Sequence, residues 1–239
     1  IFKLKIHEIN YNDDLSISYD HLFDLLKKKI TVLFIPNPNQ PIDTKIYKKK
    51  LVEIIELAEK YKTFVVVDEA YYLFGMYSSI PFVNKYRNVF VMRTFSKGFG
   101  MPSIRVGYTI GNKENMNIIS KSRIAHEQGS LNILLAEYIL DNYKDVKKNV
   151  KKIIISREYT KNELLKIGID SFGNFGNYLF IKLRSPEDVN KLKKYLFRKK
   201  IYIKSPFPKP WSQYILITIG PKIYMNTFIK SLKTYLKIK

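Results

Sequence analysis

A lysine, Lys97, stands where an apolar segment ends, in the stretch RTFSKGFGMPSIRVGY at residues 93–108. Ser96 precedes it, two glycines follow within three residues, and Arg105 comes eight residues later. A lysine that is partly removed from water can act as an amine nucleophile, as in enzymes that form Schiff bases. A serine hydroxyl, a glycine backbone and a guanidinium group together suit a phosphate. The stretch therefore predicts a nucleophilic lysine beside a phosphate site.

A second polar cluster follows the apolar run in FVVVDEAYY, where Asp68 comes directly after three valines. A carboxylate in that position is poorly solvated and needs a positive or hydrogen-bonding partner. A protonated ring nitrogen of a cofactor would be such a partner, and a helix N-cap or turn position would explain the residue equally well. A ring-nitrogen partner, a nucleophilic lysine and a phosphate site are the contacts that pyridoxal 5'-phosphate requires. The combination predicts this cofactor.

The segments around these residues predict an α/β fold with a mainly parallel sheet flanked by helices. Apolar runs typical of strands cover residues 30–36, 64–70, 88–94 and 104–111. The segment 43–62 carries apolar residues at helical spacing. The second run is continuous and β-branched, so we expect a strand buried on both faces. Ligands bind at the carboxyl ends of such strands, so the polar strand ends should converge on one crevice.

The pattern changes after residue 112. Residues 113–167 are predicted to be mostly helical, with breaks near 127–129 and Asn142. Beyond Gly168 we expect strands at 176–183, 201–204 and 214–220. We expect helices to begin at Pro186 and at Tyr224. We therefore expect a large domain over residues 1–145 and a smaller C-terminal α+β domain over 146–239. The chain opens at Ile1 on a strand-like segment, and we expect that an N-terminal part of the large domain is missing from this sequence.

The net charge of +21 is the most conspicuous feature of the composition and raises the question of nucleic-acid binding. Lysine supplies nearly all of the excess, whereas arginine, the better reader of bases, occurs seven times. The lysines are scattered along amphipathic segments, as expected for solvated helix faces. No apolar run approaches the ~20 residues that span a bilayer. We expect small-molecule substrates, with no nucleic acid and no membrane as partner.

The chain has no cysteine, which excludes disulfides and thiolate metal sites. Its three histidines share no spacing typical of metal ligands, so no metal is expected. A sequence without cysteine fits a reducing compartment, and we expect the cytoplasm.

Four motifs, in this order and spacing, resemble those of the fold type I pyridoxal-phosphate enzymes of aminotransferase class I/II. They are NPNQP at 37–41, VVVDEAYY at 65–72, the stretch around Lys97, and ITIG at 217–220. The histidinol-phosphate aminotransferase-like branch is the most similar. Each motif is weak alone, but together they span most of the chain. The resemblance implies a homodimeric transaminase that moves an amino group between a small amino donor and a keto acceptor, phosphorylated ones included.

The resemblance also implies residue roles. Lys97 resembles the catalytic lysine that forms the Schiff base and moves the substrate proton. Asp68 resembles the partner of the pyridine nitrogen, and Tyr71 resembles the donor to the phenolic oxygen of the cofactor. Ser96 and Arg105 resemble the phosphate ligands.

Several further positions match residues that line the site in relatives. Thr94 would assist the phosphate ligands, Ala70 would pack on one face of the ring, and Gln40 would reach the phenolic oxygen. On the substrate side, the matching residues are Asn177, Glu127, Arg123 and His126.

Three departures from the family pattern bear on function. Gln40 stands where the family has asparagine, and Ile42-Asp43 replace the usual Thr-Gly. Leu216 stands where the family has the arginine that binds the substrate α-carboxylate. The Gly-Ser/Ala-Asp phosphate loop and the ring-stacking aromatic residue, which precede the first motif in the family, are not in this sequence.

The leucine leaves the substrate open. Either the amino substrate lacks a carboxylate at that place, or a lysine such as Lys204 or Lys209 binds it. Two alternatives to a transaminase remain. One is a decarboxylase of a phosphorylated amino acid, a reaction that the resemblance also implies, since some relatives with these motifs catalyse it. The other is a relative that has lost cofactor and catalysis, which the missing arginine favours and the presence of Asp68, Lys97 and Arg105 opposes.

Overall fold

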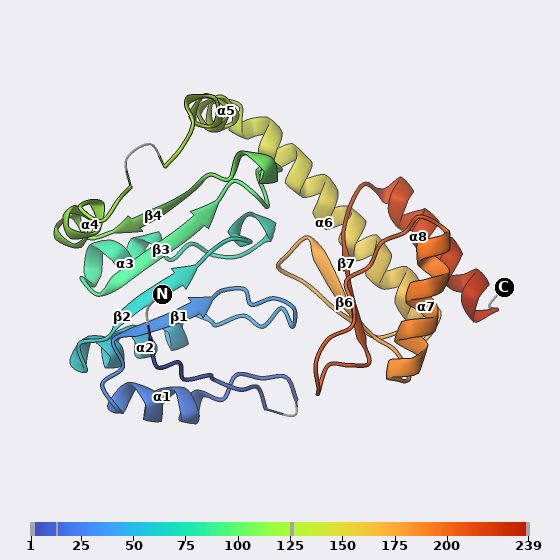
Figure 1. The fold of residues 1–239 in the computed structure, drawn as a ribbon, viewed down its shortest axis with the longest axis horizontal. Helices are drawn as coiled ribbons and strands as arrows, with labels where there is room; N and C mark the ends of the chain where they lie inside the picture. The colour runs from blue at the N-terminus through green and yellow to red at the C-terminus, as the bar shows by residue number, and fades with distance from the viewer. Residues whose placement is uncertain (1–2, 13, 125–126, 238–239) are drawn as a thin grey trace. The chain divides into compact units, whose positions relative to one another are not determined.

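The computed structural model describes residues 3–12, 14–124 and 127–237, and the chain divides into two compact units (Figure 1). The first unit comprises residues 1–40, 44–72 and 76–138, and the second comprises 41–43, 73–75 and 139–239. The change between them falls within helix α5 (Ser130–Asp141), whereas the sequence placed a domain boundary at 145. Because compactness alone does not define a domain, the predicted boundary stays a prediction.

The first unit is built on a four-stranded sheet in the order β1-β2-β3-β4. Its strands are β1 (Val32–Pro36), β2 (Phe64–Asp68), β3 (Val89–Thr94) and β4 (Gly107–Gly111). The first three are parallel and β4 runs antiparallel to β3, which confirms the mainly parallel sheet. The predicted fourth strand begins later than expected, because Pro102–Ile104 form a short 3-10 helix.

One face of this sheet is covered by helices α1 (Tyr19–Lys27), α2 (Lys48–Lys60) and α3 (Ile80–Lys85). The periodicity of α2 explains its position, since Leu51, Ile54, Ile55 and Ala58 form one fully buried stripe. The stripe belongs to the same core cluster as the inward-facing valines of β2 and β3. The helix predicted within 43–62 is confirmed, and its packing fixes the strands whose ends carry polar residues.

The other face of the sheet is more open than the sequence suggested. Phe64 is 40% exposed and Phe34 is 53% exposed, so the expectation of a strand buried on both faces is wrong for β2. The strands there border an apolar hollow of about 410 Å³ that Ile118 and Ile119 of α4 (Lys113–Ser120) also line. The continuous β-branched run predicted burial on both faces. Whether a sheet face is covered depends on segments distant in the sequence, which the residues of one strand do not reveal.

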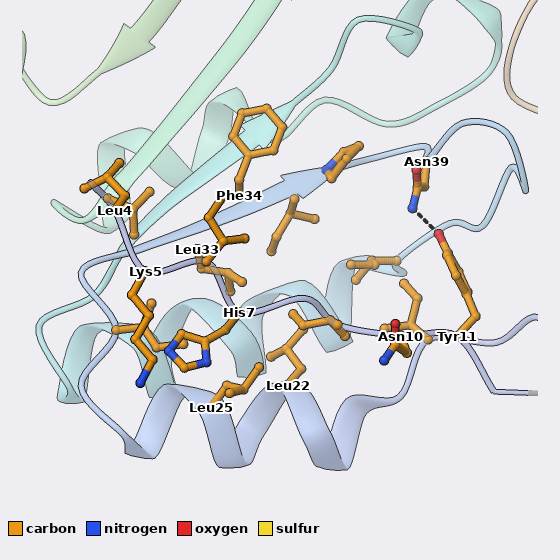
Figure 2. Close-up of a pocket in the computed structure, with 18 residues that line it drawn as sticks. Leu4, Lys5, His7, Asn10, Tyr11, Leu22, Leu25, Leu33, Phe34 and Asn39 are labelled. Carbon is orange, nitrogen blue, oxygen red and sulfur yellow. Dashed lines mark hydrogen bonds between the residues drawn. The ribbon is translucent and has the colours of Figure 1, made fainter. Parts of the chain in front are cut away.

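The opening segment also differs from its prediction. Residues 3–10 form no strand, and Tyr11 pairs with Ile17 in an isolated β-bridge. The segment instead borders an apolar pocket of about 460 Å³ together with α1 and β1 (Figure 2). At the end of β1, Asn39 donates a hydrogen bond to the Tyr11 hydroxyl, which in turn contacts Thr44. The polar residues expected to carry chemistry do not line this pocket, so it is a feature apart from the candidate site.

The second unit is an α+β layer built on the antiparallel sheet β5-β6-β7. Its elements are α6 (Tyr143–Lys166), β5 (Ser171–Phe172), β6 (Tyr178–Lys182), α7 (Pro186–Arg198), β7 (Tyr214–Thr218) and α8 (Lys222–Leu236). The three helices share one core with Leu179, Ile181, Ile215 and Ile217 of the sheet. The predicted strand at 201–204 is wrong: only Lys204 pairs with the sheet, as an isolated bridge to Leu216.

Local capping explains where α7 begins. The Ser185 hydroxyl accepts a hydrogen bond from the Asp188 N–H, at 3.2 Å, and Pro186 occupies the first turn, where its missing N–H needs no partner. Acidic Glu187 and Asp188 oppose the positive end of the helix dipole. Within the described residues, no helix of either unit is long and apolar enough to cross a membrane.

Candidate active site

Asp68 closes β2 at the middle of the first unit's sheet, in register with Pro36 of β1 and Met92 of β3. Its Oδ1 accepts a hydrogen bond from the Ala70 N–H at 2.9 Å, and its other oxygen accepts none from the described residues. Burial raises the pKa of Asp68, while the Ala70 N–H and the charge of Lys97 oppose the rise. The carboxylate thus offers one oxygen to a donor that would favour its ionised form.

Lys97 lies in a tight turn directly after β3. The Gly100 N–H donates to the Lys97 carbonyl at 3.0 Å, and Gly100 has φ +72°, a conformation that glycine adopts without strain. Buried Phe95 and Phe99 anchor the turn on either side of the half-buried lysine. Its Nζ lies 5.4 Å from the centroid of the Tyr71 ring and makes no hydrogen bond or ion pair within the described part of the chain. The turn therefore positions the Lys97 amine, which has no hydrogen-bond or ion-pair partner among the described residues and is available to react.

The Tyr71 side chain completes this group from the segment after β2. It is 6% exposed, and burial together with the Asp68 charge raises the pKa of Tyr71 to about 12. A hydrogen bond with the Gln40 side chain opposes that rise. Tyr71 is consequently a neutral hydroxyl at physiological pH and can donate a hydrogen bond. The Gln40 side chain, which is longer than the asparagine of the family, therefore reaches the Tyr71 side chain.

A guanidinium and two hydroxyl groups meet beside the Lys97 turn. Arg105 Nη1 donates to Ser96 Oγ at 3.3 Å and to the Pro102 carbonyl at 2.9 Å. Thr94 Oγ1 accepts from the Ser96 N–H at 3.0 Å. Arg105 itself is exposed and has a left-handed backbone with φ +55°. This corner presents a cation and hydroxyl groups to solvent, which is the donor set that a phosphate group takes.

A buried ion pair between Glu69 and Arg93 lies next to these residues and was not predicted from the sequence. Glu69, 1% exposed at its side chain, accepts from Arg93 Nε at 3.0 Å and from Nη2 at 2.8 Å. The Ser79 N–H donates to the other carboxylate oxygen, and the guanidinium carbon lies 3.6 Å from the centroid of the Tyr72 ring. The pair joins the ends of β2 and β3, one residue from Asp68 and from Thr94. The sequence feature that could have predicted this pair is a glutamate and an arginine at the ends of two adjacent predicted strands.

The remaining predicted residues are less closely tied to this group. Ala70 contributes its backbone N–H to Asp68, as described above. Glu127 is exposed and forms an ion pair with Arg123, and no contact within the described residues joins it to Lys97. Its neighbour Gln128 donates to the Arg105 carbonyl at 3.2 Å, a contact the sequence did not indicate. His126 lies outside the described residues.

Two predicted substrate-side positions belong to the second unit. Asn177 is half-buried, and its carbonyl accepts from the Ile219 N–H at 2.7 Å. Leu216 is buried, and its backbone exchanges hydrogen bonds of 2.9 and 3.0 Å with Lys204. Directly opposite residues of an antiparallel pair share a face, so Lys204 is the cross-strand neighbour of the position where the family has an arginine.

The groups of the first unit fit pyridoxal phosphate. One Asp68 oxygen suits a protonated ring nitrogen, the Lys97 amine suits a covalent bond to an aldehyde carbon, and the Tyr71 hydroxyl suits a phenolic oxygen. Ser96 and Arg105 suit the phosphate. Within the described residues no group of three or more His, Asp or Glu side chains could hold a metal ion.

Comparison with known proteins agrees with this geometry. The family model described as aminotransferase class I and II matches residues 1–231. Histidinol-phosphate aminotransferase of Sulfurisphaera tokodaii is 32% identical over 86% of this chain and 55% of that protein. The enzyme of that name from Lactococcus lactis is 31% identical over 100% of this chain and 66% of that protein. The chain thus spans somewhat more than half of the length of these curated relatives.

A solved structure extends the likeness to the fold. Histidinol-phosphate aminotransferase of Sinorhizobium meliloti, solved in complex with pyridoxal-5'-phosphate, matches 98% of this chain and 64% of its own, with a TM-score of 0.87 and 20% identity. At that identity the match concerns the fold alone, which is that of a fold type I transferase. With the family model covering nearly the whole sequence, the chain belongs to the aminotransferase class I and II family.

Proposed function

We propose that the chain belongs to a pyridoxal-phosphate-dependent aminotransferase that moves an amino group from a small amino donor to a keto acceptor. The observation that carries the proposal is the pairing, in one unit, of an uncommitted lysine amine with a strand-end carboxylate that keeps one oxygen free. The likeness to histidinol-phosphate aminotransferases supports phosphorylated small molecules as substrates.

Each residue of the group has a defined task in such a reaction. When bound, pyridoxal phosphate supplies an electron sink for the electron pair released at the substrate Cα. Asp68 holds a proton on the ring nitrogen, and Tyr71 donates to the phenolic oxygen. Ser96 and Arg105, assisted by Thr94, bind the phosphate. Lys97 would hold the cofactor covalently, and its amine would move the proton between the substrate Cα and the C4′ carbon of the cofactor.

The test is incubation of the purified protein with pyridoxal phosphate and a panel of amino donors, phosphorylated ones included, with a keto acceptor such as 2-oxoglutarate. Formation of a keto product from at least one donor is the expected result. Lys97→Ala should form none, while Lys49→Ala, an exposed lysine on α2, should match the parent. Absence of keto product with every donor, despite bound cofactor, would refute the transaminase proposal.

A decarboxylase acting on a phosphorylated amino acid is the second candidate, because Leu216 cannot pair with a substrate carboxylate. Release of carbon dioxide without keto product from the same donor panel would favour this candidate. A protein that binds no cofactor and forms neither product would be the degenerate relative.

We further propose that the protein acts as a homodimer. Three side chains of the first unit's part of α5 support a contact surface: Leu131 is 68% exposed, Leu134 61% and Tyr138 65%. Apolar side chains that gather on one helix and face solvent are typical of interfaces between proteins. A dimeric mass in light scattering, lost in Leu131→Asp/Leu134→Asp, is the expected outcome. A monomeric parent protein would contradict it.

The same proposal places the enzyme in the cytoplasm. A cysteine-free sequence is compatible with that reducing compartment. Fractionation of cells that carry the tagged protein tests the assignment, with recovery in the cytoplasmic fraction expected and recovery elsewhere contradicting it.

A further inference from the structure

Asp43 of the second unit is a buried carboxylate that the reaction proposed above does not use. It is 6% exposed, and its backbone is left-handed with φ +64°. Aspartate tolerates this conformation better than most residues, but only glycine adopts it without strain. A side chain retained at such a position is expected to make contacts that offset the strain.

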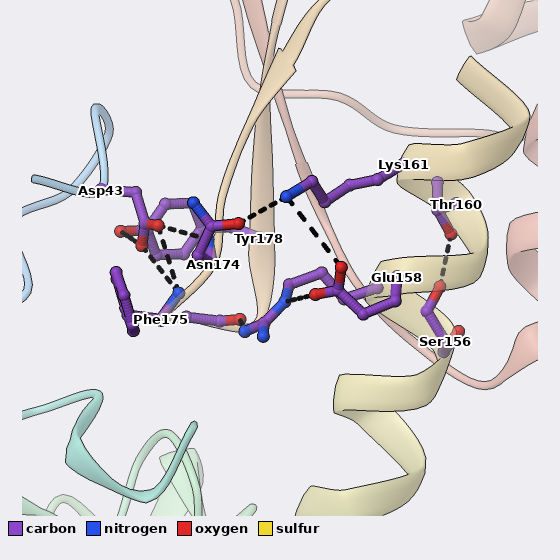
Figure 3. Close-up of polar contacts among 10 residues, drawn as sticks. Asp43, Ser156, Glu158, Thr160, Lys161, Asn174, Phe175 and Tyr178 are labelled. Carbon is purple, nitrogen blue, oxygen red and sulfur yellow. Dashed lines mark hydrogen bonds and ion pairs between the residues drawn. The ribbon is translucent and has the colours of Figure 1, made fainter. Parts of the chain in front are cut away.

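Three donors contact the Asp43 carboxylate, two from one turn of the chain and one from the first residue of β6 (Figure 3). The Phe175 N–H lies 3.1 Å from each carboxylate oxygen, the Asn174 N–H donates to Oδ2, and the Tyr178 hydroxyl donates to Oδ1 at 3.2 Å. Two successive backbone N–H groups aimed at one point form an anion-binding concavity, and a buried hydroxyl extends it. The concavity here is filled by a side chain of the same chain.

The carbonyl side of the same turn is held by cations. Buried Arg157 donates from Nη1 to the Gly176 carbonyl at 2.8 Å, and Lys161 donates to Asn174 Oδ1. Burial raises the pKa of Asp43, and the charge of Arg157 opposes that rise. The turn is thus held by opposite charges, with the Asp43 carboxylate at its N–H groups and the Arg157 guanidinium at the Gly176 carbonyl.

Close packing against Tyr178 shapes the turn. A Cβ at Gly173 would lie 2.5 Å from the Tyr178 carbonyl oxygen, and a Cβ at Gly176 would lie 2.1 Å from the Tyr178 ring. Neither glycine can be replaced without displacing that backbone or ring. The two N–H groups between them are therefore presented in one arrangement, and the turn leads directly into Asn177 and β6.

We propose that the N–H groups of Asn174 and Phe175, with the Tyr178 hydroxyl, form a carboxylate-binding site that Asp43 occupies as a built-in ligand. Asp43 acts as a positioning residue, because its carboxylate fixes the turn that precedes Asn177. If the side chain of Asp43 is removed, the site accepts a small free carboxylate such as formate. This inference goes beyond the proposed function and holds whatever reaction the first unit performs.

The experiment compares thermal unfolding of the parent protein, Asp43→Gly and Asp43→Asn in sodium formate and in sodium chloride at equal ionic strength. Asp43→Gly relieves the backbone strain and opens the site, while Asp43→Asn keeps the volume of the side chain and loses its charge. Both variants should melt lower than the parent in chloride, by roughly 5 °C. Asp43→Gly leaves the two N–H groups and the Tyr178 hydroxyl without their acceptor, and Asp43→Asn turns one acceptor oxygen into an NH2 group that faces a donor. Formate should raise the melting temperature of Asp43→Gly by several degrees more than that of the parent or of Asp43→Asn.

Matched controls isolate the effect. Asp170→Ala removes an exposed aspartate of the same unit and should melt like the parent in both salts. Asp43→Gly/Tyr178→Phe should respond to formate less than Asp43→Gly, because one donor is gone. An Asp43→Gly protein that folds only in formate would also support the proposal.

Two results would overturn it. One is an Asp43→Gly melting temperature equal to that of the parent, and the other is a formate response no larger than that of the parent. If Asp43→Gly is unfolded in both salts, the isosteric Asp43→Asn decides: a melting temperature equal to that of the parent rejects the carboxylate site, and a lower one supports it.

Discussion

The strand ends around Asp68 and the turn around Asp43 both hold a carboxylate partly or wholly out of water, but they use its oxygens differently. At Asp43 both oxygens accept hydrogen bonds from the chain's own N–H and O–H groups. At Asp68 one oxygen accepts a single N–H, and the nearby Lys97 amine makes no hydrogen bond within the described residues. Burial raises the pKa of both groups.

The number of internal hydrogen bonds therefore distinguishes a carboxylate that stabilises the fold, Asp43, from one that can bind a ligand, Asp68. A buried polar group whose partners are all internal has its desolvation compensated in the folded chain. One that is left half-satisfied is a cost to the folded chain, and a bound cofactor removes that cost. Substitutions at the two sites should consequently separate stability from chemistry.

The largest effect on chemistry is expected for Lys97→Ala. Loss of the amine removes both the covalent bond to the cofactor and the group that moves the proton, so product formation should fall on the order of 10⁴-fold. The melting temperature should stay within about 2 °C of the parent, because Nζ makes no hydrogen bond to the described residues. Rates of keto-product formation and thermal unfolding measure the two quantities. Residual activity near the parent level would contradict the assigned role.

The largest effect on stability in the first unit is expected one residue from Asp68. Arg93→Ala leaves the buried Glu69 carboxylate without its guanidinium partner, and we expect the free energy of unfolding to fall by about 3–5 kcal/mol. Glu69→Gln/Arg93→Met should be closer to the parent, since no charge is left unpaired. Urea unfolding measures both variants. A loss below about 1 kcal/mol for Arg93→Ala would show that the pair does not hold the strand ends.

Asp68→Asn should change binding and stability in opposite directions. It exchanges a carboxylate for a neutral amide, so the affinity for pyridoxal phosphate should fall about 10- to 100-fold. In the cofactor-free protein it should raise the melting temperature at neutral pH, because the ionised form of Asp68 is penalised by burial. Titration by absorbance and thermal unfolding measure the two effects. An unchanged affinity would remove Asp68 from the site.

The pH dependence of that stability difference has a definite sign. Since burial raises the pKa of Asp68 in the folded protein above its ordinary value, its contribution to stability is most favourable below the unfolded pKa and is lost as pH rises through the folded pKa. The advantage of Asp68→Asn should therefore vanish below about pH 4 and appear above it. An advantage that grows as pH falls would contradict the assignment.

The smallest effect is expected for Glu127→Ala. Its ion pair with Arg123 is exposed, so the free energy of unfolding should change by less than about 0.5 kcal/mol. A rise in KM without a change in kcat would support the predicted substrate-binding role. An unchanged KM would leave Glu127 as a surface residue.

The sequence predicted the parts of the fold that local patterns determine. The helical spacing of Leu51, Ile54, Ile55 and Ala58 marked α2, and the apolar runs marked the strands of the first unit. It misplaced Ile201–Lys204, because an apolar run next to a sheet does not reveal that only Lys204 pairs. It overstated burial of β2, because coverage of a sheet face is set by segments distant in the chain.

The candidate site was predictable to the same degree. Asp68, Ser96, Lys97 and Arg105 follow from residue types at strand ends, where a parallel sheet gathers ligand contacts. Glu69–Arg93 and Asp43 were not recognised, since each depends on a partner that only the folded chain brings near. Leu216 stands in place of the family arginine, and its cross-strand neighbour Lys204 offers a cation beside that position.

The covalent bond from Lys97 to the cofactor is the central claim, and mass spectrometry tests it most directly. The protein is incubated with one equivalent of pyridoxal phosphate, reduced with borohydride, digested and mapped. The chain contains 35 lysines, so indiscriminate labelling would be readily recognised. We expect a stoichiometric adduct on the peptide that carries Lys97 and its loss in Lys97→Arg. Label distributed over other lysines, with Lys97 unmodified, would contradict it.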